Sequence, residues 1–301
     1  MTPLSGVIVV NYGSHVLIER NIPLDLPPSM IVVIVDNFST RDERTKIEAL
    51  CASRGWTLDR QDNIGFGAGV NRGVALAAAL GCDRYLIVNP DLAADTATLE
   101  LLALRASDDR RTMHGPTILR PDGSIWFSGG AVRVKSGSTT TKPGTDASQP
   151  GGWLTGACLA LHDELWSDIS GFDDDYFLYW EDVDLSWRVA AAGGRLKVWP
   201  DLIAVHDVGG TQVGTGKSPT YVFYNCRNRL VFARKHLSTR NQLRWLIRTP
   251  TYARRVALRG GRQAFRDNAA PLTWAAVRGS FRGVASVLCG LASRRSGSAL
   301  S

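Results

Sequence analysis

The chain has 301 residues, of which 44% are hydrophobic, so it is long enough to bury the core of one large domain or of one domain with an appendage. Its net charge of +7 divides unevenly: residues 227–301 hold 16 Lys or Arg against one acid (+15), whereas residues 1–226 hold 19 against 27 (−8). The five cysteines include no CxxC pair, which argues against a disulfide scaffold. The sequence also shows no signal-peptide pattern and no apolar run of about 18 residues, which argues against an exported or membrane-spanning protein. We therefore predict a cytosolic protein.

Short apolar runs alternate with helical patterns through the first ninety residues. The pattern predicts strands at 7–11, 31–37, 56–60 and 85–89, and helices at 13–22, 41–53 and 67–80. Such alternation is typical of a parallel sheet with crossover helices, and the absence of polar residues within the runs indicates strands covered on both faces. We therefore expect an α/β fold. Further on, residues 122–134 predict a hairpin, and residues 136–151 predict a Ser/Thr/Gly/Pro loop that could act as a lid.

Polar side chains follow three of these strands, where each strand ends. They are Asn11 with Tyr12, Asp36 with Asn37, and Asn89 with Asp91. Ligands of open α/β sheets bind at the carboxyl ends of the strands, so the sequence predicts one crevice that these side chains share.

The segment 35–42, VDNFSTRD, has two interpretations. It fits a loop whose side chains contact a nucleobase or ribose, and it also fits a helix start capped by Ser39 or Thr40. We expect both to hold, with Asp36, which precedes the cap, as the functional residue.

The segment 63–73, NIGFGAGVNRG, places Gly65, Gly67 and Gly69 before an Ala-rich helix, so bare backbone amides could approach phosphate oxygens. It is not a dinucleotide-binding fingerprint, because the third glycine of GxGxxG would fall at Val70. The alternative is an ordinary glycine-rich turn.

Two residues at predicted strand ends could hold a cation. Asp91 ends the turn NPD, where a hard cation bridging a diphosphate would find a carboxylate oxygen, and His206 follows a later apolar run and could be the second ligand. The alternatives are a plain turn before a helix and a structural histidine.

The stretch 171–188, GFDDDYFLYWEDVDLSWR, packs six carboxylates among large aromatic residues. Acids against a partly apolar cavity can have tuned pKa values, which indicates a place for chemistry. From Glu181 the pattern is helical, so Glu181, Asp182 and Asp184 fall in a first turn, where they could also merely complement the helix dipole.

Taken together, these motifs resemble the family 2 glycosyltransferases, most closely the bacterial rhamnosyltransferase-like branch with the GT-A fold. The resemblance covers about residues 5–235 and also includes GGWLTGACL at 151–159, GGT after His206, and YNCRN at 224–228. It implies a mostly parallel α/β catalytic domain at 1–235, followed by a basic helical extension at 236–301.

The resemblance also implies a role for each matching residue. Asp182 would be the catalytic base, and Asp91 with His206 would bind a divalent cation, Mg²⁺ or Mn²⁺, although Asn89 replaces the first Asp of the family's DxD motif. The donor-binding residues would be Asn11, Tyr12, Asp36, Asn63, Gly65, Asn71, Asn89 and Arg227, with Asp36 on the base and Arg227 on the diphosphate. The acceptor-side residues would be Trp153, Thr155, Gly156, Trp180 and Glu181.

The implied activity is inverting transfer of a sugar from a nucleotide-diphosphate donor to a glycan or polyprenyl-linked glycan, in cell-envelope polysaccharide synthesis. The resemblance favours dTDP-rhamnose as donor, and UDP-galactofuranose or a UDP-hexose is the alternative. Two other classes stay open: a nucleotide-dependent oxidoreductase, and a nucleic-acid-binding protein that acts through its basic end.

Beyond residue 228 the pattern predicts long arginine-studded helices, one covering 244–266 and one covering 271–290, with Trp245, Tyr252, Trp274 and Phe281 among the arginines. Basic faces with aromatic anchors suit an anionic membrane surface, so we expect a protein held peripherally at the inner face of the cell membrane. The alternatives are a helical tail packed on the core and nucleic-acid binding, of which the latter is not expected.

Overall fold

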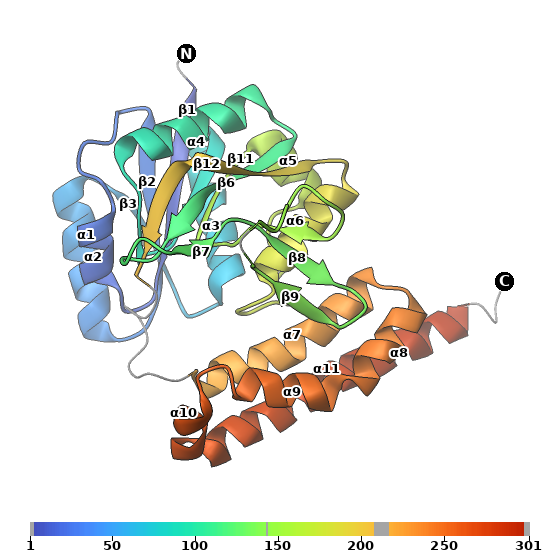
Figure 1. Cartoon of the computed structure of the whole chain (residues 1–301). Helices are drawn as coiled ribbons and strands as arrows, with labels where there is room; N and C mark the ends of the chain where they lie inside the picture. The colour runs from blue at the N-terminus through green and yellow to red at the C-terminus, as the bar shows by residue number, and fades with distance from the viewer. Residues whose placement is uncertain (1–2, 143, 208–216, 298–301) are drawn as a thin grey trace. The chain divides into compact units, whose positions relative to one another are not determined.

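The computed structural model describes residues 3–142, 144–207 and 217–297, with side chains up to residue 292 (Figure 1). The GGT motif at 209–211 lies outside the described residues. The chain forms two compact units, the first made of Met1–Ala131, Thr140–Phe177 and Glu181–Val213, and the second of Val132–Thr139, Leu178–Trp180 and Gly214–Ser301. Whether residues 1–235 act as one domain and 236–301 as another stays a prediction.

The first unit is built on a nine-stranded sheet with the order β3-β2-β1-β4-β11-β6-β12-β5, and β7 pairs with β6. The strands are β1 (Leu4–Asn11), β2 (Met30–Asn37), β3 (Thr57–Gln61), β4 (Cys82–Val88), β5 (Leu92–Ala93), β6 (Thr112–Leu119), β7 (Ile125–Phe127), β11 (Cys158–His162) and β12 (Arg195–His206). Strands β3, β2, β1 and β4 are parallel to one another, whereas β11 is antiparallel to both β4 and β6. The predicted α/β fold is confirmed, but the sheet is mixed rather than mostly parallel, because β11, β5 and β7 each pair antiparallel with a neighbour.

Helices of the first unit follow the predicted alternation. They are α1 (His15–Asn21), α2 (Arg41–Arg54), α3 (Phe66–Ala79), α4 (Thr96–Asp108), α5 (Asp163–Ile169) and α6 (Glu181–Ala191). Helix α3 packs on β1 and β2, and α4 packs on β4, β6 and β11. The apolar runs Val7–Val10 and Val32–Val35 are buried throughout, as expected for strands covered on both faces.

The predicted hairpin at 122–134 is wrong. Strand β7 pairs antiparallel with β6 across a turn at 120–124, whereas β8 (Gly130–Arg133) pairs antiparallel with β10 (Gly152–Trp153). The sequence shows two short strands around Gly129 but not their partners, because strand pairing depends on segments far apart in the chain. Within the predicted loop 136–151, Ser138–Thr140 forms a further short strand, β9.

The second unit is helical, with α7 (Pro219–His236), α8 (Thr239–Ile247), α9 (Thr249–Ala257), α10 (Arg262–Asp267) and α11 (Ala269–Gly297). Figure 1 shows the long α11 running beside α7. The single long helix predicted for 244–266 is wrong, because Pro250 starts a new helix and the pair Gly260 and Gly261 ends it. No helix among the described residues is long and apolar enough to cross a membrane.

Buried Arg229 on α7 organises the second unit. Its guanidinium donates to Gly137 O at 2.6 Å and to Trp245 O at 3.2 Å, and it lies over the rings of Trp245 and Tyr252. Burial lowers the pKa of Arg229 to about 10. These contacts explain why the short segment around Gly137, distant in sequence, belongs to the same compact unit as α7.

Candidate active site

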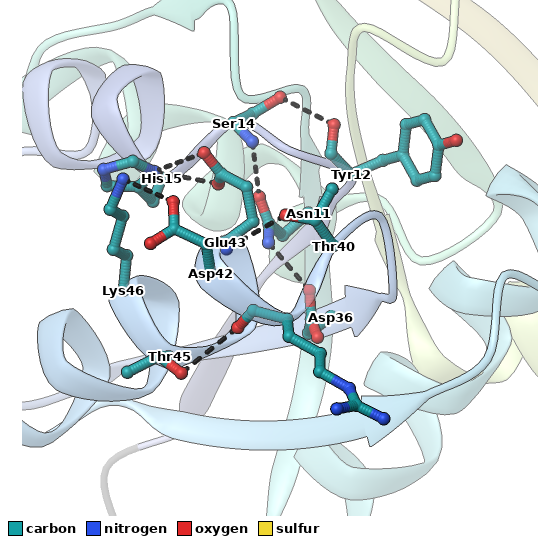
Figure 2. A network of polar contacts seen from close by, with 11 residues as sticks. Asn11, Tyr12, Ser14, His15, Asp36, Thr40, Asp42, Glu43, Thr45 and Lys46 are labelled. Carbon is teal, nitrogen blue, oxygen red and sulfur yellow. Dashed lines mark hydrogen bonds and ion pairs between the residues drawn. The ribbon is translucent and has the colours of Figure 1, made fainter.

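The ends of β1 and β2 meet in a buried polar network, which Figure 2 shows from close by. Parallel register places Asn11 beside Asp36, and Asn11 Nδ2 donates to Asp36 Oδ1 at 2.8 Å. The other end of the Asn11 amide accepts from Ser14 N at 2.9 Å. Asp36 Oδ2 accepts from Arg44 Nε at 2.6 Å, so both oxygens of this fully buried carboxylate have partners. The network fixes the geometry of both strand ends.

The start of α2 confirms the capping interpretation of VDNFSTRD. The Thr40 side chain accepts from Glu43 N, and the first turn carries Asp42 and Glu43. Figure 2 shows Asp42 paired with Lys46 and Glu43 with His15, while the ring of Tyr12 points away from the network. That ring is 58% exposed, which leaves its face free for a planar ligand.

The glycines before α3 let the backbone approach a second chain segment. Gly65 has φ +94°, and a Cβ there would collide with the backbone of Phe177, whose carbonyl accepts from Phe66 N at 2.9 Å. A Cβ at Gly67 would lie 2.8 Å from Phe172 Cβ. Asn63 Oδ1 accepts from Gly65 N at 3.2 Å. Close packing therefore accounts for Gly65 and Gly67, and contact of Gly65 and Asn63 with a donor stays a prediction.

Asn71 on α3 holds the loop that leads toward the acidic helix. Its Nδ2 donates to Phe172 O at 2.8 Å, and its Oδ1 accepts from Phe172 N at the same distance. Both ends of the amide are thus used on one backbone residue, so the structure gives Asn71 a clamping role, and its predicted contact with the donor stays a prediction.

Asp91 and His206 come together although 115 residues separate them. Strand β12 pairs with β5 at His206 and Leu92, which brings His206 Nε2 to 2.9 Å from Asp91 Oδ1. Both side chains are largely buried, and the ring of Trp126 lies 4.3 Å from that of His206. Asn89 Oδ1 is buried with no partner among the described residues.

An imidazole nitrogen and a carboxylate oxygen, with a buried amide oxygen nearby in sequence, are donors that suit Mn²⁺ or Mg²⁺. Within the described residues, no group of three or more His, Cys, Asp or Glu could hold a metal ion. A cation here would therefore take only two of its ligands from the pair Asp91 and His206, and its remaining positions from ligand oxygens and water.

The two acids at the start of α6 have unusual surroundings. Asp182 Oδ1 accepts from Val183 N at 2.8 Å and Oδ2 accepts from Gly156 N at 3.2 Å. Burial raises the pKa of Asp182 to about 6, against these two hydrogen bonds, which lower it. Burial first, and then the neighbouring charge of Asp182, raises the pKa of Glu181 well above its usual range. Glu181 Oε2 has no partner among the described residues. Asp182 is therefore a carboxylate that can take up a proton near neutral pH.

Glu181 follows directly on a strained turn. Tyr179 and Trp180 have φ values of +65° and +74°, which non-glycine residues rarely adopt. Asn228 on α7 donates to the carbonyls of Leu178 and Tyr179 at 2.9 and 2.8 Å, which stabilises this conformation within the second unit. The ring of Trp180 is buried against Phe232 and Trp245. Packing is the role that the structure gives Trp180, and contact with an acceptor stays a prediction.

Among the remaining acceptor-side candidates, Gly156 contacts Asp182 through its amide, and Trp153 and Thr155 are buried beside it in the chain. Trp153 Nε1 has no partner among the described residues. Arg227 lies on α7 and donates to Asn228 Oδ1 at 2.6 Å, so its predicted contact with the diphosphate also stays a prediction. A cavity of about 670 Å³ lies beside β12, lined by Arg105, His114 and Trp199 among others, and none of the predicted site residues lines it.

No protein-family model matches the chain. Among solved structures, the mannosyltransferase PcManGT of Pyrobaculum calidifontis, in complex with GDP-Man and Mn²⁺, superposes with a TM-score of 0.55 at 20% identity and covers 97% of this chain and 80% of that one. A fragment of S. aureus TarS in complex with UDP superposes with a TM-score of 0.53 at 16% identity and covers 98% of this chain and 92% of that one. Both likenesses confirm the GT-A fold.

Relatives in sequence support the family that the motifs resemble. An N-acetylglucosaminyl-diphospho-decaprenol L-rhamnosyltransferase of Mycobacterium tuberculosis is 28% identical over 281 residues, covering 82% of this chain and 90% of the relative. Rhamnosyltransferase WbbL of Escherichia coli is 37% identical over 54 residues, covering 18% of this chain and 20% of that protein. The chain is a glycosyltransferase, and these likenesses support the rhamnosyltransferase-like branch of family 2. The predicted enzyme class is confirmed, and the oxidoreductase alternative is set aside.

Several residues that shape this transferase were missed in the sequence. Arg44 binds Asp36 and also donates to Gln61 O, and Trp126 lies against His206. Asn21 donates to Pro90 O at 2.8 Å and so supports the turn that carries Asp91. The sequence carries no signal for these partners, because each acts on a residue from another element.

Proposed function

We propose that this transferase moves a rhamnosyl group from dTDP-rhamnose to a polyprenyl-diphosphate-linked glycan, with inversion at the anomeric carbon. The likeness to the mycobacterial enzyme, which is named an N-acetylglucosaminyl-diphospho-decaprenol L-rhamnosyltransferase, supports the rhamnosyl group and the lipid-linked acceptor. The observation that carries the proposal is the Asp182 carboxylate, which has two backbone donors, no cationic partner among the described residues, and a pKa of about 6.

Asp182 acts as the general base. It takes the proton from the acceptor hydroxyl while that oxygen bonds to the anomeric carbon and the bond from this carbon to the diphosphate oxygen breaks. A base with a pKa of about 6 is ionised at neutral pH and is more basic than an ordinary aspartate, which suits this task. Burial raises the pKa of Glu181 well above its usual range, which favours the protonated form that can donate a hydrogen bond to the acceptor.

The donor lies along the ends of β1, β2 and β4. Tyr12 offers an exposed ring on which the base can stack, while Asn11 and Asp36 hold the loops in place through their mutual hydrogen bond. Contacts of Asn63 and Gly65 with the sugar nucleotide, and of Arg227 with its diphosphate, are further predictions that the family resemblance supplies.

Asp91 and His206 would hold a divalent cation, with the oxygen of Asn89 close by in sequence. When bound, such a cation neutralises the diphosphate leaving group. The Mn²⁺ in PcManGT supports this assignment. We further propose that the basic second unit faces an anionic membrane surface at the inner face of the cell membrane, where a lipid-linked acceptor would lie.

A donor screen on the full chain tests the proposed function. In thermal shift with Mn²⁺ or Mg²⁺, dTDP-rhamnose should raise the melting temperature more than UDP-galactofuranose or UDP-hexoses do, because a ligand that binds only the folded state stabilises it. Transfer to a short-chain polyprenyl-diphosphate N-acetylglucosamine should then give a product of inverted configuration. Stronger stabilisation and faster transfer with a UDP-sugar would overturn the donor assignment and favour the alternative donor class.

A further inference from the structure

Helix α11 has two apolar faces, and only one of them is covered. Its inner face carries small residues, and a Cβ at Gly279 would collide with the backbone of Phe223 on α7. A Cβ at Gly283 would lie 2.9 Å from Leu230 Cβ. Leu272 and Val287 on this same face are buried. The glycines let α11 lie close along α7, and this contact accounts for one side of the helix.

The opposite side bears a second apolar row that is largely exposed. The row consists of Trp274 (63% exposed), Val277 (55%), Phe281 (72%) and Leu288 (53%). Their spacing of three, four and seven residues puts them on one side of the helix. We name these four residues the α11 outer stripe. Arg278 and Arg282 flank it on one side, and the Arg278 guanidinium lies 6.0 Å from the Trp274 ring centre. A helix apolar on two opposite sides needs a second environment for the uncovered side.

We propose that the α11 outer stripe docks the transferase on an anionic lipid surface, with the helix lying in the plane of the headgroups. The assignment rests on the proposed function in that a lipid-linked acceptor is presented at such a surface. Aromatic and aliphatic side chains flanked by arginines are the pattern of interfacial helices, whose apolar side enters the boundary between headgroups and acyl chains. A helix of 29 residues is about 44 Å long and can present the whole row at once.

Charge selects a lipid surface over a second copy of the chain. The sequence holds no Asp or Glu from residue 268 onward, and residues 227–301 hold 16 cations against one acid. A dimer through this face would bring Arg278 and Arg282 near the same arginines of the other copy, with no acid on the helix to pair with them. Anionic headgroups supply the missing counter-charge, and acyl chains supply the apolar environment. Nucleic acid would supply only the counter-charge.

The test measures sedimentation of the full chain with vesicles of 30% phosphatidylglycerol in phosphatidylcholine, compared with pure phosphatidylcholine. The wild type should bind the anionic vesicles, and the variant Trp274→Ser/Phe281→Ser should bind them at least tenfold more weakly. A matched control, Leu101→Ser/Leu104→Ser, removes two exposed leucines from α4 in the first unit and should bind as the wild type does. The single variant Phe281→Ser serves if the double variant does not melt cooperatively.

Arg278→Gln/Arg282→Gln should also weaken binding to anionic vesicles, and the binding that this variant keeps should be less sensitive to salt. Wild-type chain that stays in the supernatant, or a stripe variant that sediments as the wild type does, would overturn the proposal. Two further results would overturn it. In one, the wild type dimerises and the stripe variant loses the dimer while its vesicle binding is unchanged. In the other, duplex DNA or RNA displaces the chain from vesicles at equal phosphate concentration. Transfer to a short-chain acceptor in solution is measured in parallel. The stripe variant should keep that activity, so a failed docking proposal and a failed transferase proposal give different results.

Discussion

Asp36 and Asp182 are two carboxylates of the same compact unit that have different hydrogen-bond partners. Asp36 at the end of β2 has one oxygen on the Asn11 amide and the other on the Arg44 guanidinium. Asp182 at the start of α6 has only two backbone amides, with the ionisable Glu181 next to it. One carboxylate is held by a charged partner, and the other has none among the described residues.

The comparison teaches that the partners of a carboxylate separate a structural acid from a reactive one. Asp36, with an arginine and an amide as partners, holds two loops together. A desolvated carboxylate without a cation has a raised pKa and can exchange a proton near neutral pH. Both arise from the same residue type in motifs that look equally acidic in the sequence.

The largest effect should follow from Asp182→Asn. Removal of a general base typically costs about 10²- to 10⁴-fold in rate, so transfer should fall by that factor while donor affinity, measured by isothermal titration, stays nearly unchanged. In the wild type, transfer should decline as the pH falls through about 6, because the base becomes protonated. A variant that loses donor affinity as severely as transfer would mean that Asp182 binds the donor instead.

Asp36→Ala should have the next largest effect, and on stability rather than on chemistry. It leaves the Arg44 guanidinium and the Asn11 amide without their shared partner, which should cost about 2–4 kcal/mol in the free energy of unfolding. The control Asp42→Ala removes an exposed ion pair with Lys46 and should leave the free energy of unfolding nearly unchanged. Equal losses of unfolding free energy for Asp36→Ala and Asp42→Ala in urea denaturation would contradict the contrast between a buried and an exposed carboxylate.

Asp91→Ala should weaken donor binding about 10- to 100-fold in the presence of Mn²⁺ and much less in its absence, since it removes half of the proposed cation pair. His206→Ala should behave in the same way. Asp207→Ala is the matched control, because Asp207 follows His206 in the chain but its exposed carboxylate pairs with Arg20. Donor titrations with and without metal that fail to distinguish Asp91→Ala from this control would refute the metal assignment.

The smallest effect concerns stability at Asp182. A carboxylate whose pKa is raised on folding destabilises the folded state above that pKa, and the penalty disappears below the pKa of the unfolded chain, near 4. Asp182→Asn should therefore be about 1–3 kcal/mol more stable than the wild type at pH 7–8, with the gap closing as the pH falls from 6 to 4. At exposed Asp122, Ser124 lowers the pKa, so Asp122→Asn should show no such gain. A gain at Asp182 that does not change with pH would contradict this account.

The sequence by itself determined the features that depend on local pattern. The strands and helices of residues 7–89, the Thr40 cap of α2, and the acids in the first turn of α6 follow from hydrophobic period and from capping chemistry, which act within a few residues. The polar strand ends were likewise foreseen, because parallel strands place their carboxyl ends at one edge of the sheet.

Only the tertiary structure decided what those residues touch. Three contacts join segments that no local pattern connects. They are Arg44 with Asp36, Asn71 with Phe172, and His206 with Asp91. The glycines at 65 and 67, which we predicted to approach phosphate, are explained by contact with Phe177 and Phe172. On α11, periodicity shows two apolar rows, but only packing against α7 decides which row is buried and which stays exposed, because helical spacing is the same on both sides.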